Sequence, residues 1–179
     1  REIMKIHIIR HGLTEGNKNN EYSGWDDTPL SKEGIEELYA LKETVSYPEV
    51  DVHFASDLSR DIDPHEIIFG TEQEVQLLKE MREIHFGDFE GKTVAETQGV
   101  PFFDGFLSGE RVVNGETFAE FSDRINQGLD TILTYLSEHN MNEASLVCHS
   151  GVVKMIIILL ESLTPKDFYR FSIANGRGI

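Results

Sequence analysis

Apolar residues along this chain gather in short β-branched runs that alternate with longer stretches of helical periodicity. Residues 4–9 read MKIHII and predict a strand. Residues 28–45 follow with apolar positions at helical spacing, and Ser31 is a residue type that commonly caps a helix N-terminus. The same reasoning predicts strands at 49–55, 74–81, 144–149 and 171–175, helices at 58–69, 117–138 and 151–163, and mostly irregular structure at 84–115.

This alternation of strands and helices predicts an α/β fold with a mainly parallel sheet covered by helices on both faces. The chain has 179 residues, a length that suits one domain with a full hydrophobic core. Hydrophobic residues make up 39% and charged residues 27% of the chain, which is the composition of an ordinary globular protein. We therefore predict a single domain over residues 1–179.

Basic and small residues follow three of the predicted strands. His11 comes directly after the first strand, His149 and Ser150 belong to the end of the fourth, and Arg60 lies shortly after the second. Ligands of open α/β sheets sit beyond the carboxyl ends of the strands. We therefore expect these residues to meet at one edge of the sheet.

These residue types suit a phosphoryl group. Arg10 and Arg60 offer guanidinium donors that match phosphate oxygens, and the amide of Asn17 adds a further donor. His11 is of a type that is neutral near pH 7 and can attack phosphorus with a ring nitrogen. His149 can stabilise the charge of the group being transferred.

Glu83, in the segment REIHFGDFEG, is the candidate acid that protonates the leaving oxygen. Alternatives remain for several of these residues. Glu83 could be one of several solvated loop carboxylates, Arg60 could pair with Asp57 or Asp61 at the surface, and Asn17 could simply shape a turn.

Charge and cysteine content narrow the partners. The formal net charge of −16 argues against binding nucleic acid or an anionic membrane, although a few arginines are enough to bind a small anion. No segment approaches the roughly 18 apolar residues of a membrane span. The single cysteine, Cys148, allows no internal disulfide or cysteine-rich zinc site, and it favours a cytoplasmic setting.

The segment RHGLTEGN, residues 10–17, resembles the R-H-G-x-x-x-x-N signature of the histidine phosphatase superfamily, also called phosphoglycerate mutase-like. One short motif is weak evidence, but six motifs in order form a specific pattern. The resemblance continues through GWDDTPLSKEG (24–34), FASDLSR (54–60), EIHFGDFEG (83–91), GETFAEFSDR (115–124) and LVCHSGVVK (146–154).

This resemblance implies a three-layer α/β/α sandwich with a mainly parallel central sheet, and a covalent phosphohistidine intermediate. By position, His11 matches the nucleophile and Glu83 the proton donor, while His149 matches a second catalytic histidine in the phosphate pocket. No metal and no organic cofactor are expected. The remaining candidates, for contacts with phosphate or substrate, are Arg10, Asn17, Arg60, Tyr22, Ser23 and Ser150.

The chain departs from the family pattern directly after Arg60. Family members commonly have Ala and then Gln-Thr-Ala there, whereas this chain reads RDIDPHEII over residues 60–68. Because Pro64 is costly inside a helix, we expect either a helix that starts later or a kink between Asp61 and His65. Asp61 and Asp63 add two carboxylates that could draw the Arg60 guanidinium away from phosphate.

The predicted activity is hydrolysis of a small phosphate monoester. Between Ile84 and Glu116 only Lys92 and Arg111 carry a positive charge, few for a phosphoglycerate, so a phosphatase is favoured over a mutase. The aromatic segment FFDGF (102–106) predicts aromatic walls over the pocket. The expected partners are a phosphorylated metabolite and inorganic phosphate as product, with no nucleic acid and no membrane. The alternatives are a phosphoglycerate mutase, an alpha-ribazole phosphatase-like activity, and a non-catalytic phosphate-binding domain.

Overall fold

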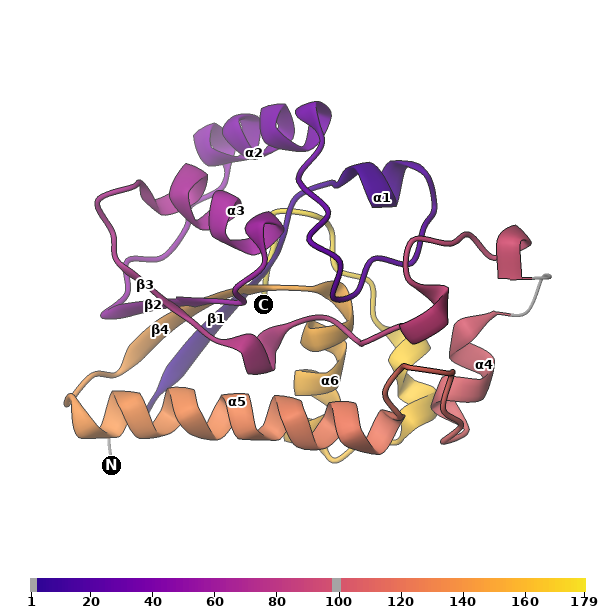
Figure 1. The fold of residues 1–179 in the computed structure, drawn as a ribbon. Helices are drawn as coiled ribbons and strands as arrows, with labels where there is room; N and C mark the ends of the chain where they lie inside the picture. Colours follow the sequence, from indigo (N-terminus) through magenta and orange to yellow (C-terminus); the bar gives the residue numbers. More distant parts are fainter. Residues whose placement is uncertain (1–2, 98–100) are drawn as a thin grey trace.

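A parallel four-stranded sheet forms the centre of the computed structural model, which describes residues 3–97 and 101–179 (Figure 1). The strands lie in the order β1-β4-β2-β3, and each neighbouring pair runs parallel. Their bounds are Lys5–Arg10 for β1, Val52–Ala55 for β2, Val75–Leu77 for β3 and Glu143–Cys148 for β4.

Helices cover both faces of this sheet (Figure 1). The helices α2 (Lys32–Thr44) and α3 (Ser59–Phe69) lie on one face, and α5 (Phe118–Glu138) and α6 (Ser150–Glu161) lie on the other. The shorter helices are α1 (Glu15–Lys18), α4 (Phe102–Leu107), and the 3₁₀ turns η1 (Lys79–Met81), η2 (Gly87–Phe89), η3 (Ala95–Thr97) and η4 (Pro165–Arg170).

Strand alternation divides the core into two layers. Ile8, Phe54 and Leu146 belong to the larger cluster, which also contains the buried stripe of α5. Their sequence neighbours Ile9 and Val147 belong to the smaller cluster under α2 and α3. Because successive side chains of a strand point to opposite faces, each strand supplies both cores. The predicted three-layer α/β/α sandwich is thereby confirmed.

Most of the predicted elements are present, and the differences are local. Ser31 caps α2 as expected, because its side chain accepts a hydrogen bond from the Gly34 N–H. The strand predicted at 74–81 is shorter, since Lys79–Met81 turns into a 3₁₀ helix. The mostly irregular segment 84–115 contains the short helix α4, which the sequence pattern did not indicate.

The strand predicted at 171–175 is wrong. Residues 177–179 lie along the free edge of β1 in its place, with an antiparallel bridge between Ile9 and Gly178. A side chain on Gly178 would collide with the Ile8 carbonyl, so this close approach needs glycine. The predicted segment thus ends two residues before the segment that pairs with β1.

Of the two alternatives predicted around Pro64, the later helix start is wrong, and the kink between Asp61 and His65 stays a prediction. Helix α3 begins at Ser59 and includes Pro64, opened by the N–H groups of Asp61 and Ile62, which donate to the Leu58 carbonyl. Pro64 and His65 are both buried, so packing outweighs the backbone cost of proline at this position. Asp61 therefore lies in the first turn of a helix directly behind Arg60.

No helix in the part of the chain that the structure describes has the length and apolar character needed to cross a bilayer.

The loop that follows β1 is fixed by the start of α2. The Leu13 carbonyl accepts hydrogen bonds from the Ser31 backbone N–H, at 2.9 Å, and from the Ser31 hydroxyl, at 3.1 Å. Gly34 lies against the same carbonyl, and a Cβ at Gly34 would overlap it. This packing holds the segment that begins with His11.

Gly34→Ala is expected to destabilise the protein by about 1–3 kcal/mol, because the added methyl must displace the backbone of Leu13. An ordinary helical Gly→Ala change stabilises by roughly 0.5–1 kcal/mol. Urea denaturation measures the change, with Glu37→Ala at an exposed position of α2 as the control. A stabilised Gly34→Ala protein would contradict this packing.

Candidate active site

The register of the sheet brings two histidines together. Arg10 at the end of β1 pairs with Cys148 at the end of β4, so the residues that follow, His11 and His149, leave the sheet side by side. The His11 N–H donates to the Cys148 carbonyl at 2.9 Å, and the two imidazole centroids are 5.1 Å apart. Three predicted segments thus meet at one sheet edge, because β2 ends beside β4 at Ala55.

His11 is held with one ring nitrogen occupied. Its Nδ1 lies 2.6 Å from the Gly12 carbonyl, which can only accept, so Nδ1 carries the hydrogen and Nε2 keeps its lone pair. Burial lowers the pKa of His11 to about 3, with His149 acting in the same direction. His11 is therefore neutral at physiological pH, with Nε2 available as a nucleophile.

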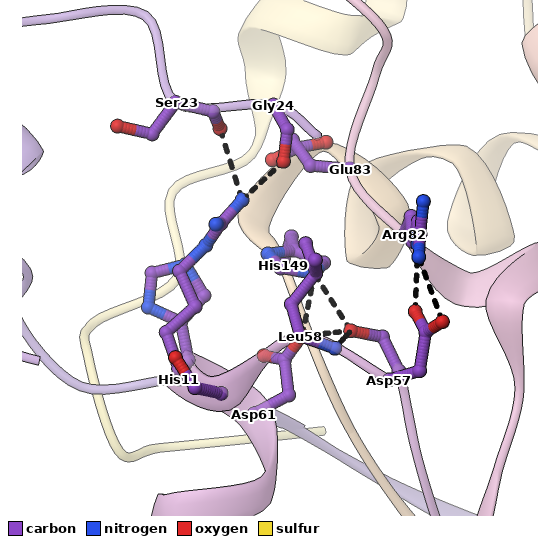
Figure 2. Close-up of polar contacts among 12 residues, drawn as sticks. His11, Ser23, Gly24, Asp57, Leu58, Asp61, Arg82, Glu83 and His149 are labelled. Atoms are coloured by element: carbon purple, nitrogen blue, oxygen red, sulfur yellow. Dashed lines mark hydrogen bonds and ion pairs between the residues drawn. The ribbon is translucent and has the colours of Figure 1, made fainter. Parts of the chain in front are cut away.

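His149 is completely buried and contacts a carboxylate. Its Nε2 lies 2.5 Å from Oδ2 of Asp61 and 3.2 Å from the hydroxyl of Ser56, and Ser56 also donates to Asp61. Its Nδ1 has no hydrogen-bond partner among the described residues. Figure 2 shows Asp61 and His149 together with His11. The side chain of His149 is thus held through Nε2, and Nδ1 is left without a partner.

Arg60 is fully buried, and its guanidinium holds a loop. Nη1 donates to the Asp26 carbonyl at 2.6 Å, and Nη2 donates to the carbonyls of Ser23 and Gly24 (Figure 2). The alternative of a surface arginine paired with an aspartate is wrong for this residue. Asp57 instead forms a bidentate pair with Arg82, at 2.6 and 2.8 Å, and the Arg60 charge acts on His11.

Arg10 and Asn17 are both half-buried. Arg10 donates to the Ile173 carbonyl at 2.6 Å, and its Nε has no partner among the described residues. Asn17 accepts from the Thr14 N–H at 3.2 Å while Thr14 accepts from the Asn17 N–H, which forms a capping box on α1. The capping box of α1 thus orients the amide of Asn17. Asn17 also helps to shape the local turn, which is the alternative that the sequence left open.

Glu83 sits at the N-terminus of α6. Its carboxylate accepts from the Gly151 N–H at 3.1 Å and from the Ile84 N–H at 3.0 Å, and only 8% of the residue is exposed. A side chain at Gly151 would collide with it, so this glycine is what allows the approach. The Glu83 carboxylate raises the pKa values of both Arg10 and His149, and Figure 2 shows Glu83 near His149.

Two further side chains fix the segment that carries Glu83. Arg124 from α5 donates to the carbonyls of Glu80, Arg82 and Glu83 at 2.7 to 3.0 Å. The indole N–H of Trp25 donates to the same Glu83 carbonyl at 3.0 Å. Trp25 thus packs the loop, and Arg124 is a positioning residue that the sequence reasoning missed.

The remaining predicted contact residues, Tyr22, Ser23 and Ser150, have different surroundings. Tyr22 is half-buried among Phe86, Phe89 and Phe102, and its hydroxyl accepts from the Phe102 N–H. Ser23 presents its carbonyl to Arg60, while its hydroxyl packs toward Gly16 (Figure 2). Ser150 is half-buried as the first residue of α6.

The aromatic walls predicted from FFDGF are not present in that form. Phe102 and Phe106 are buried in the larger core, at 5% and 2% exposure. With Phe89 they also line a cavity of about 200 Å³, but none of the residues around that cavity belongs to the predicted catalytic set. The apolar spacing of this segment reflects a short core helix.

Cys148 is a buried strand residue, and burial raises the pKa of its thiol well above the usual range. It is therefore a poor nucleophile. Within residues 3–97 and 101–179, no group of three or more His, Cys, Asp or Glu side chains is arranged to hold a metal ion. Sequence reasoning also missed Asp61 as a member of the site, although its departure from the family pattern was visible.

Comparison with known proteins places this geometry in a family. The family model described as histidine phosphatase superfamily (branch 1) matches residues 6–177. The adenosylcobalamin/alpha-ribazole phosphatase of Escherichia coli is 26% identical, with 97% of this chain and 87% of that protein covered. A 2,3-bisphosphoglycerate-dependent phosphoglycerate mutase of Staphylococcus epidermidis is 34% identical, with 96% and 91% covered.

Among solved structures, the fold is similar to a phosphoserine phosphatase from Entamoeba histolytica, crystallised with 3-phosphoglyceric acid. The TM-score is 0.78 at 27% identity, with 97% of this chain and 88% of that chain covered. This chain therefore belongs to the histidine phosphatase superfamily.

Proposed function

We propose that this chain is a cofactor-independent phosphatase that hydrolyses a small phosphate monoester through a phosphohistidine on His11. The observation that carries this proposal is the state of His11: Nδ1 is held by the Gly12 carbonyl, and the low pKa keeps the ring neutral. A neutral imidazole with its hydrogen fixed on Nδ1 has one nucleophilic atom, Nε2.

In the first half-reaction, Nε2 of His11 attacks phosphorus as the bond from phosphorus to the leaving oxygen breaks. A protonated Glu83 gives its proton to that oxygen, so an alcohol departs and Glu83 becomes a carboxylate. Arg10, Arg60 and His149 surround His11 and offer positive charge or N–H donors to the phosphoryl oxygens.

In the second half-reaction, water attacks the phosphorus of phospho-His11. The Glu83 carboxylate takes a proton from that water, the bond from Nε2 to phosphorus breaks, and inorganic phosphate forms. The pocket and the acid are both restored, and no metal or organic cofactor is consumed. The cycle needs only residues of this chain, a phosphate ester and water.

The unpartnered buried donors support an anionic ligand in this pocket. The Nε atoms of Arg10 and Arg60 and the Nδ1 atom of His149 are buried without a hydrogen-bond partner among the described residues. Leaving such groups unpaired is costly, and phosphate oxygens would supply acceptors. The negative surface of the chain favours a small phosphorylated metabolite over nucleic acid or a membrane, and the free thiol of Cys148 agrees with a cytoplasmic setting.

A mutase is the second candidate because a phosphoglycerate mutase is 34% identical over most of this chain. A phosphoglycerate needs cationic contacts for its carboxylate as well as its phosphate. Of the two cations between Ile84 and Glu116, Arg111 is exposed and bound to Glu120 and the Gly115 carbonyl, and Lys92 is exposed. The relative named alpha-ribazole phosphatase supports release of phosphate from a larger, ring-containing ester as a third possibility.

His11→Ala is expected to abolish both turnover of p-nitrophenyl phosphate and the acid-labile phosphoenzyme, because it removes Nε2, the nucleophile of the proposed reaction. Rapid acid quenching with ³²P-labelled substrate measures the phosphoenzyme. His7→Ala is the matched control, since His7 lies on the same strand and pairs with Glu143 at the surface. Label in His11→Ala would contradict the assignment, and tight phosphate binding without turnover in the native protein would favour a binding domain.

Glu83→Gln is expected to lower kcat/KM about 100-fold or more for an alkyl phosphate, and less than about tenfold for p-nitrophenyl phosphate. The reason is that p-nitrophenolate leaves without a proton, whereas an alkoxide does not. Steady-state kinetics on both esters measure the ratio, with Glu80→Gln as the neighbouring control. Equal losses on the two esters would show that Glu83 is not the proton donor.

Incubation with 3-phosphoglycerate and a trace of 2,3-bisphosphoglycerate separates the two activities. We expect inorganic phosphate as the product, because water is the acceptor and the two cations of segment 84–116, Lys92 and Arg111, are exposed at the surface. ³¹P NMR follows both products in one sample. Accumulation of 2-phosphoglycerate would assign the chain to the mutases.

A further inference from the structure

Asp61 introduces a carboxylate where the phosphate pocket needs positive charge. It comes from the first turn of α3, is fully buried, and lies 2.5 Å from Nε2 of His149 (Figure 2). Its Oδ1 has no hydrogen-bond partner among the described residues. Burial, the unpartnered oxygen and the nearby anion site all disfavour the ionised carboxylate, so the protonated form of Asp61 is favoured.

The position of that proton decides the state of His149. When a shared proton lies between Asp61 and Nε2 of His149, Nδ1 carries a hydrogen. This holds both when the shared proton is bound to Asp61 and when it is bound to Nε2. When the shared proton is lost, the carboxylate can only accept, so the ring hydrogen moves to Nε2 to donate to it. Nδ1 is then left with a lone pair in place of an N–H.

We propose that Asp61 is a positioning residue that controls the tautomer of His149, so that the phosphate pocket functions only while the Asp61–His149 pair holds its shared proton. With the proton present, Nδ1–H is a donor for a phosphoryl oxygen. With the proton absent, a lone pair replaces that donor, and a buried negative charge opposes the substrate dianion. This inference rests on the proposed function, since it assigns a role within the same site.

Burial places the loss of this proton near neutral pH. It raises the pKa of Asp61 to about 7, against the opposing influence of His11 and Arg60. Burial also lowers the pKa of His149 well below its usual range, so the shared proton rests on Asp61 in the empty site. The proton is therefore held below about pH 7 and lost above it.

Charged groups from several elements influence the pKa values of the pair. Arg60 of α3 lowers the pKa of Asp61 and so favours its ionised carboxylate. Arg60, Arg10 of β1 and Arg124 of α5 all lower the pKa of His149 and so disfavour a charged imidazole. Glu83 and Asp57, from the loops after β3 and β2, act in the opposite direction. Cys148, at the end of β4, stays a neutral thiol.

The pH dependence of kcat/KM for p-nitrophenyl phosphate tests this role in native protein and in Asp61→Asn. This ester stays dianionic above neutral pH and leaves without a proton, so neither substrate ionisation nor Glu83 limits the alkaline range. Native kcat/KM is expected to fall about tenfold per pH unit above the pKa of the pair. Asp61→Asn, whose amide donates to Nε2 at every pH, is expected to change less than about threefold over the same range.

Two further variants separate this role from a structural one. Asp61→Ala removes the acceptor and leaves the Ser56 hydroxyl beside Nε2, so it should also lack the alkaline fall. Asp63→Asn removes an exposed carboxylate from the same helix and should keep the native profile. If Asp61→Asn and Asp61→Ala both fall with pH in parallel with the native protein, the proposal is wrong.

Nitrogen-15 NMR of histidine-labelled protein provides a readout that needs no turnover. His149→Gln identifies the His149 signals by their loss, and Nδ1 should change from protonated to unprotonated between about pH 6 and 8.5 in native protein but not in Asp61→Asn. Turnover without this change would overturn the inference and leave the phosphatase standing. The change without turnover of any ester would refute the proposed function while supporting control of the tautomer by Asp61.

Discussion

The parallel pairing of β1 with β4 is the constraint on which the candidate site depends. Because Arg10 pairs with Cys148, the two strands end level with each other and deliver His11 and His149 as neighbours. A slip of one residue would turn one of these side chains toward the opposite face of the sheet. The buried alternation of Ile8 and Ile9 between two cores fixes that register. The same strand register therefore satisfies both the packing of the core and the geometry of the site.

Two arginines, the buried Arg60 and the partly buried Arg124, organise the loops around this edge. Arg60 gathers the carbonyls of residues 23, 24 and 26, and Arg124 gathers those of residues 80, 82 and 83. A guanidinium offers five donors in a fixed fork, so one side chain can hold several turns of irregular chain. In a chain of net charge −16, these internal arginines also concentrate positive charge where an anion would bind.

Sequence predicted the fold and the converging strand ends because both depend on periodicity and on short motifs. It failed where a contact between distant residues decides the outcome. The edge of β1 is taken by the segment around Gly178, whose role depends on close approach of two backbones. The sequence predicts Phe102 and Phe106 as walls over the phosphate pocket, but packing places them in the core and along a cavity that contains none of the predicted catalytic residues.

The position of Asp61 illustrates the same limit at the site. Its unusual identity was visible in the sequence, and the expectation was that it would compete for Arg60. Its Oδ2 instead contacts Nε2 of His149, because Asp61 lies in the first turn of α3, close to the end of β4. The separation along the sequence does not show whether the Asp61 carboxylate contacts Arg60 or His149. The Cβ direction in a folded helix decides it.

The most direct test of the central claim is the chemical identity of the trapped phosphoenzyme. The hydrogen bond from Nδ1 of His11 to the Gly12 carbonyl leaves one nitrogen free. Peptide mapping with NMR of the phosphohistidine isomer should therefore find phosphate on His11, bound to Nε2. Phosphate on Nδ1, or on another residue, would contradict the account.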